Sequence, residues 1–166
     1  SKNKFGIPFT DDEILSSKEW LKSKGWSEGE PFICLIARDS NYLGKHPFYG
    51  NNQEEQFKNY SYHNFRDSEI NTYLPALEWL ADQGVWVLRM GKIMERQLVS
   101  NKDKIIDYAF LKEKNDLLDI WLFANCTACI STACGPDYIP YVYNKPLLFL
   151  NALPLSEIWS FANNTR

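Results

Sequence analysis

The sequence predicts an α/β domain, Rossmann-like and three-layered, with a mostly parallel sheet of about five strands. Two observations carry this prediction. Short apolar runs alternate with segments of helical period, and the first run is apolar at nearly every position, as in strands buried on both faces. The length of 166 residues corresponds to one domain of about 150 residues. We therefore expect a single domain over 1–166, best supported over 30–150.

The first predicted strand, residues 31–39, ends in Arg38 and Asp39. The following residues, 40–68, contain Gly, Pro, Asn and aromatic side chains without a clear period, so we expect a long loop. Within it, residues 60–68 bring tyrosine, histidine and arginine together. Loops of this composition commonly line binding sites.

A helical pattern begins at Ser68 and closes at Gly84. Pro75 interrupts the pattern, so either the helix kinks there or its regular part begins near Thr72. Residues 85–90 then predict a second strand, which reaches Arg89 beside Gly91.

The same alternation continues to the end of the chain. Gly135, in the turn Ala133-Cys134-Gly135-Pro136 after the fourth strand, is expected to supply the tight backbone bend there. The further predicted elements are a strand at 105–109, a helix capped by Asn115 or Asp116, a strand at 128–132, a helix at 137–143, a strand at 146–150 and a helix at 155–162.

Composition and charge exclude several classes of protein. An apolar content of 45% is far above that of disordered chains, and 18 basic against 21 acidic side chains create no positive field for nucleic acid. Prolines and polar residues interrupt the longest apolar stretch, 139–150, so we expect no membrane span. Sparse cysteines and the lack of a signal-peptide pattern favour a cytoplasmic protein.

The cysteines invite a metal or redox interpretation, because Cys126 and Cys129 are two residues apart and Cys134 follows. A structural zinc site needs four ligands, and both histidines lie far upstream without the required spacing. We expect no metal, and interpret Cys34 and Cys129 as small buried residues within strands.

Ligands of parallel α/β sheets bind beyond the carboxyl ends of the strands. Three features are predicted there: Arg38 with Asp39, Arg89 with Gly91, and the turn from Ser131 to Gly135. Guanidinium groups, a threonine hydroxyl and the backbone N–H groups of a helix start all bind phosphate oxygens, so we expect an anion pocket for a diphosphate. The alternative is that the arginines only pair with Asp39, Asp107 or Asp116.

Other phosphate and hydrolase motifs are missing from the chain. Neither Gly-x-Gly-x-x-Gly nor a Gly-Lys-Ser/Thr loop occurs, and Gly-x-Ser-x-Gly is also absent. Asp39 and His63 are the candidates for a catalytic base.

A set of ordered motifs resembles a bacterial family of predicted glycosyltransferases associated with surface polysaccharide synthesis, itself more distantly similar to fucosyltransferases. The motifs, spread over about residues 30–150, are Arg38-Asp39-Ser40 with Tyr42-Leu43, Tyr62-His-Asn-Phe-Arg-Asp-Ser68, Tyr73-Leu-Pro-Ala76, Arg89-Met-Gly91, Ile106-Asp-Tyr-Ala109 and Asp116-Leu-Leu-Asp119.

The resemblance implies the C-terminal, nucleotide-sugar-binding half of a two-domain GT-B enzyme that works without a cofactor or metal. The partners would be a nucleotide diphosphate sugar and the hydroxyl of an acceptor glycan or polypeptide, with a separate acceptor-binding domain. By this resemblance, the diphosphate is held by Arg38 and Arg89, the phosphate turn is formed by Ser131, Thr132, Ala133, Cys134 and Gly135, and the cleft is lined by Asp39, His63, Arg66 and Gly91.

Two positions depart from the family pattern. Ile36 stands where such families often carry histidine, and the turn reads Ser-Thr-Ala-Cys-Gly instead of Gly-Thr-Ser-Ser-Gly. These departures favour an alternative, a nucleotide-sugar-binding module or inactive remnant. A transferase of pyruvyl groups on a similar sheet is the third possibility; glycosyl transfer is the function we expect.

Overall fold

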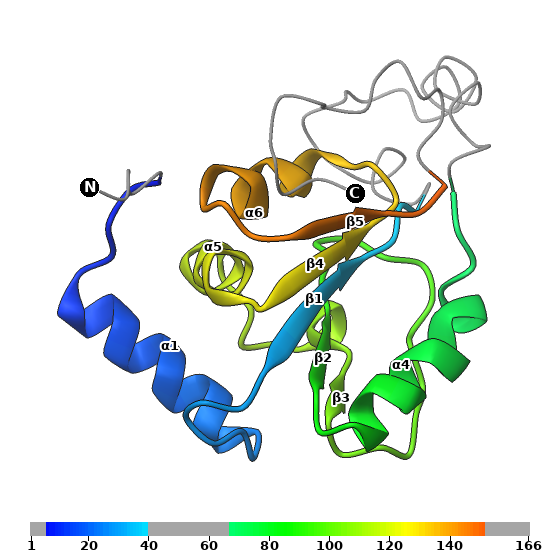
Figure 1. The fold of residues 1–166 in the computed structure, drawn as a ribbon, viewed down its shortest axis with the longest axis horizontal. Helices are drawn as coiled ribbons and strands as arrows, with labels where there is room; N and C mark the ends of the chain where they lie inside the picture. Colours follow the sequence, from blue (N-terminus) through cyan, green and yellow to red (C-terminus); the bar gives the residue numbers. More distant parts are fainter. Residues whose placement is uncertain (1–5, 40–66, 152–166) are drawn as a thin grey trace.

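A computed structural model describes residues 6–39 and 67–151 of the chain, and in this part five strands form one parallel sheet with helices on both faces (Figure 1). The elements in chain order are α1 (Asp11–Ser23), β1 (Phe32–Ile36), the 3₁₀ helix η3 (Ile70–Tyr73), α4 (Leu74–Asp82), β2 (Trp86–Arg89), β3 (Ile105–Ile106), η4 (Tyr108–Phe110), α5 (Asp116–Asn125), β4 (Ala128–Ser131), η5 (Gly135–Asp137), α6 (Tyr138–Val142) and β5 (Leu147–Phe149). The predicted α/β, Rossmann-like class is confirmed.

The strands lie in the order β3-β2-β1-β4-β5, so β1 is central. The chain first builds outward from β1 to β2 and β3, and then returns to the other side of β1 to add β4 and β5 (Figure 1). Leu35 of β1 pairs with Arg89 of β2, and Ile36 pairs with Ser131 of β4. The three strands therefore end at nearly the same level.

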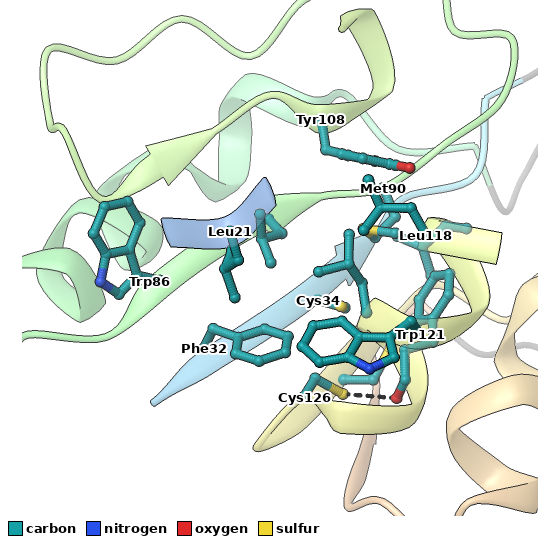
Figure 2. Packing of buried hydrophobic residues seen from close by; sticks show 14 of the residues in the cluster. Leu21, Phe32, Cys34, Trp86, Met90, Tyr108, Leu118, Trp121 and Cys126 are labelled. Carbon is teal, nitrogen blue, oxygen red and sulfur yellow. Dashed lines mark hydrogen bonds between the residues drawn. The ribbon is translucent and has the colours of Figure 1, made fainter. Parts of the chain in front are cut away.

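The hydrophobic core has two parts because side chains alternate across the sheet. Phe32 and Cys34 of β1 belong to the larger cluster, which α1 and α5 cover with Leu21 and Trp121 (Figure 2). On the opposite face, Leu35 packs in a second cluster with residues of η3, α4 and β2. All five residues of β1 are buried, as the continuous apolar run predicts.

The structure contains a helix, α1, that the sequence analysis does not include. Thr10 and Glu13 form a capping box at its start: the Glu13 N–H donates to Thr10 Oγ1 at 3.3 Å, and the Thr10 N–H donates to the Glu13 carboxylate at 2.7 Å. The pattern Thr-x-x-Glu before an apolar stretch is a recognised helix start and could have predicted it.

Three predicted boundaries change. The third strand is only Ile105–Ile106, because Asp107 accepts hydrogen bonds from Arg89 and from the Leu98 N–H and the chain leaves the sheet there. Pro75 lies in the first turn of α4, directly after the 3₁₀ helix η3, and its missing N–H costs nothing there. The helix predicted at 137–143 is divided into η5 and the short α6.

No helix in the two described ranges has the length and apolar content needed to cross a bilayer. The predicted helix at 155–162 and residues 40–66 of the predicted long loop lie outside the described residues.

Candidate functional site

The sheet has its topological switch point between β1 and β4, where the chain changes the direction in which it adds strands. In folds of this kind, ligands bind in the crevice outside the carboxyl ends of the strands near that point. Arg38 follows β1, Arg89 ends β2, and the bend from Ser131 follows β4. All three predicted features thus lie at the carboxyl edge of the sheet.

A cavity of about 180 Å³, open to solvent, lies at this edge beyond β1 and β2. Its wall is formed by the end of β1, by the segment that leads into η3, and by the end of β2 with the loop after it. The lining residues are Ala37, Arg38, Asp39, Asp67, Ser68, Glu69, Ile70, Arg89, Glu95 and Arg96. The cavity therefore brings together three arginines and four carboxylate residues.

Arg38 lines the cavity and is hydrogen-bonded to residues on both sides of the β1 end. Its guanidinium Nε donates to Asp67 Oδ1 at 3.2 Å, and the side chain is mostly shielded from solvent. Its backbone N–H donates to Thr132 Oγ1 at 2.7 Å, while its carbonyl accepts the Ser68 N–H at 3.2 Å. The Thr132 hydroxyl thus links the ends of β1 and β4, and is itself fully buried.

Arg89 is the most deeply buried charged side chain at the site, with 1% of its surface exposed. Its Nη1 donates to Asp107 Oδ1 at 3.0 Å, and its guanidinium carbon lies 5.5 Å from the centre of the Phe110 ring. Its Nε–H has no hydrogen-bond partner among the described residues. A buried donor without a partner costs about 1–3 kcal/mol, so this group is suited to an acceptor oxygen entering the cavity.

Asp39 fixes the loop that follows β2. Its Oδ2 accepts the Glu95 N–H at 2.8 Å, across 56 positions of sequence. The next residue, Arg96, pairs with Glu69 from the segment before η3. Asp39 therefore lines the cavity and also holds the backbone of Glu95 in place.

The bend after β4 is held by a buried carboxylate. Asp137 accepts the Ser131 hydroxyl and, at 2.7 Å, the Cys134 N–H. The Ala133 N–H donates to Ser131 Oγ at 3.2 Å. These two backbone donors are thus satisfied within the bend, and the bend does not belong to the cavity lining.

The sequence analysis expects Gly135 to supply the tight bend here. In the structure, the left-handed backbone conformation is instead at Ala133, with a φ of 59°. Gly135 is exposed, and a Cβ there would meet no atom within 4 Å. Gly91, beyond β2, has a φ of 154°, which side chains rarely adopt, and a Cβ there would also require the Met94 side chain to move. Gly91 is also outside the cavity lining.

Burial raises the pKa of two titratable groups in the bend. The pKa of Asp137 rises to about 6, and that of the Cys134 thiol to about 12. In the core, burial also raises the pKa of Cys34 and Cys129, which lie on adjacent strands opposite each other. Over 6–39 and 67–151, no group of three His, Cys, Asp or Glu side chains is arranged to hold a metal ion.

Two predicted site residues, His63 and Arg66, lie outside the described residues. Conversely, five polar residues at the cavity are not selected by the sequence analysis: Asp67, Ser68, Glu69, Glu95 and Arg96. Asp67 and Ser68 belong to the aromatic and basic stretch already noted, so that signal was available. Glu95 and Arg96 could have been predicted only from their position a few residues after the end of β2.

Comparison with family models, with curated proteins and with solved structures finds no match for this chain.

Proposed function

We propose that this domain binds a nucleotide diphosphate sugar and acts as the donor-binding part of a glycosyltransferase. The observation that supports it most is the cavity at the carboxyl edge of a Rossmann-like sheet, which Arg38 and the buried Arg89 both line. Among the described residues, the Nε–H of Arg89 has no partner. Guanidinium groups bind phosphate oxygens through parallel hydrogen bonds, and a diphosphate offers several such oxygens.

In the proposed reaction, an acceptor hydroxyl attacks the anomeric carbon while the bond to the nucleoside diphosphate breaks. Negative charge then develops on the departing phosphate oxygen. Donors already fixed around that oxygen stabilise the charge, and the loss of one donor of this kind typically costs about 2.7–4 kcal/mol of barrier. Arg89 suits this role because its position is fixed by Asp107 and Phe110.

A second candidate is a module that binds the nucleotide sugar without turnover. The arginine pairs favour it: Arg38 and Arg89 each have a carboxylate partner, so part of their charge is neutralised before a ligand arrives. Only the transferase candidate has an acceptor, a glycan or polypeptide, which is recognised outside this cavity by a further domain.

Calorimetric titration with UDP-glucose, UDP-N-acetylglucosamine, GDP-mannose and GDP-fucose tests the proposal. We expect one of them to bind, and Arg38→Ala to weaken its binding about ten-fold, because a charge-assisted hydrogen bond contributes about 1.5–3 kcal/mol. Asp67→Asn should strengthen binding, since the carboxylate that competes for Arg38 Nε is removed.

Asp82→Asn is the matched control, because Asp82 forms its ion pair with Lys102 outside the cavity lining. Unchanged affinity in Arg38→Ala would contradict the proposed site. Release of nucleoside diphosphate from the bound donor separates transfer from simple binding.

A further inference from the structure

The four carboxylates of the cavity differ in whether they have a partner. Asp67 accepts from Arg38 Nε, Glu69 accepts from Arg96, and Asp39 accepts the Glu95 N–H. The Glu95 side chain has no hydrogen-bond or ion-pair partner among the residues that the structure describes. Glu95 is an exposed residue, so its carboxylate can accept hydrogen bonds from a ligand that enters the cavity.

The backbone that carries Glu95 is nevertheless held in place. Its own N–H is bound by Asp39 from the end of β1, and the adjacent Arg96 is paired with Glu69. Two successive residues of the loop are therefore anchored to two different walls of the cavity. This restricts the backbone position of Glu95, so a ligand has to order only its side chain.

The charges divide the cavity into two kinds of contact. Arg89 contributes a buried N–H that has no partner in the part of the chain that the structure describes, and this N–H suits an anionic oxygen. Glu95 contributes a carboxylate, which repels an anionic oxygen and accepts hydrogen bonds from neutral hydroxyl groups. A ligand with an anionic group at one end and hydroxyl groups at the other satisfies both, and a nucleotide sugar is such a ligand.

We propose that Glu95 accepts hydrogen bonds from hydroxyl groups of the donor's sugar, and that Asp39 is a positioning residue that acts through Glu95. This inference rests on the proposed function and names the part of the same ligand that each group contacts. Arg38 and Arg89 bind the diphosphate, and Glu95 distinguishes a nucleotide sugar from the nucleoside diphosphate alone.

The test compares the affinity for a nucleotide sugar with that for its nucleoside diphosphate, using UDP-glucose against UDP and GDP-mannose against GDP. In Glu95→Ala we expect the affinity for the nucleotide sugar to fall about ten-fold and that for the nucleoside diphosphate to change less than about two-fold. Glu95→Gln should give an intermediate loss, because its amide oxygen still accepts one hydrogen bond.

Glu19→Gln is the control, since Glu19 is an exposed residue of α1 outside the cavity lining. An equal change for both ligands in Glu95→Ala would overturn this inference and leave the proposed function standing. If the unaltered protein binds neither class of ligand, both proposals fall.

The positioning role of Asp39 is tested with a double-mutant cycle. If Asp39 acts through Glu95, Asp39→Ala lowers the affinity for the nucleotide sugar, but adding it to Glu95→Ala causes no further loss. If the fold-losses of affinity from the two single substitutions multiply in the double variant, Asp39 does not act through Glu95 and the positioning role is overturned. Thermal unfolding of each variant identifies any that fail to fold, and for those Asp39→Asn replaces Asp39→Ala.

Discussion

Two carboxylates, Asp107 and Asp137, hold polar groups at the carboxyl edge of the sheet. Asp107 accepts hydrogen bonds from the Arg89 guanidinium and from the Leu98 N–H. Asp137 accepts hydrogen bonds from the Ser131 hydroxyl and from the Cys134 N–H. The positions of Arg89 and Ser131 at strand ends were predictable from the sequence, because apolar runs end there. Their hydrogen-bond partners were not predictable from the sequence. Asp107, for example, lies 18 positions after Arg89 and comes close to it only in the folded sheet.

Asp137 should make the stability of the protein depend on pH. Burial raises its pKa to about 6 from the ordinary value of 3.8. The folded protein therefore binds the proton more tightly than the unfolded chain, and the contribution to stability, largest below about pH 4, is lost as the pH rises to about 6. The difference between the two pKa values corresponds to about 3 kcal/mol.

We expect Asp137→Asn to remove this dependence, because the amide keeps an acceptor for the Cys134 N–H and does not ionise. Urea unfolding of both proteins at pH 4 and pH 7 should show the variant gaining about 2.4 kcal/mol relative to the unaltered protein at the higher pH, because at pH 4 part of the effect is already lost. Asp103→Asn, an exposed substitution, is the control. A difference that is the same at both pH values would contradict the prediction.

At the scale of elements, local signals account for most of the helices and strands. Continuous apolar runs gave β1 and β2, and the helical period with an Asn cap gave α5, where Asn115 accepts the Leu118 N–H at 2.9 Å. The capping box of Thr10 and Glu13 is a local signal for α1. The early end of the third strand is not local, because Asp107 accepts a hydrogen bond from the Leu98 N–H outside the sheet.

Removing the cap of α1 should destabilise the protein by a measurable amount. Thr10→Ala leaves the Glu13 N–H without its acceptor, and such substitutions cost about 1 kcal/mol. Because Leu21 anchors α1 in the core, we expect the whole domain to lose this stability in urea unfolding. Ser16→Ala, on an exposed position of the same helix, should change stability by less than about 0.5 kcal/mol.

At the scale of the whole molecule, the order of the strands determines where stability resides. β1 and its neighbours are enclosed by clusters on both faces, whereas β5 is an edge strand whose Leu148 is 45% exposed. Substitutions of the same type should therefore have very different costs in the two places.

Leu88→Ala, at a fully buried position of β2, should cost about 2–5 kcal/mol, because it leaves a cavity in the larger cluster. Leu148→Ala on the edge strand should cost less than about 1 kcal/mol. Denaturant unfolding of the two variants provides the comparison. Similar losses would show that β5 is packed more tightly than its exposure indicates.

The sequence by itself determined the class of fold, the strand ends that carry Arg38 and Arg89, and the turn after β4, because these depend on local patterns of apolar and polar residues. Only the tertiary structure decided the strand order, the carboxylate partner of each arginine, and the presence of Glu95 and Arg96 at the cavity. These features depend on contacts between distant parts of the chain. Such contacts are fixed by how the helices and strands pack and by which buried charges find a partner, and a local pattern contains neither.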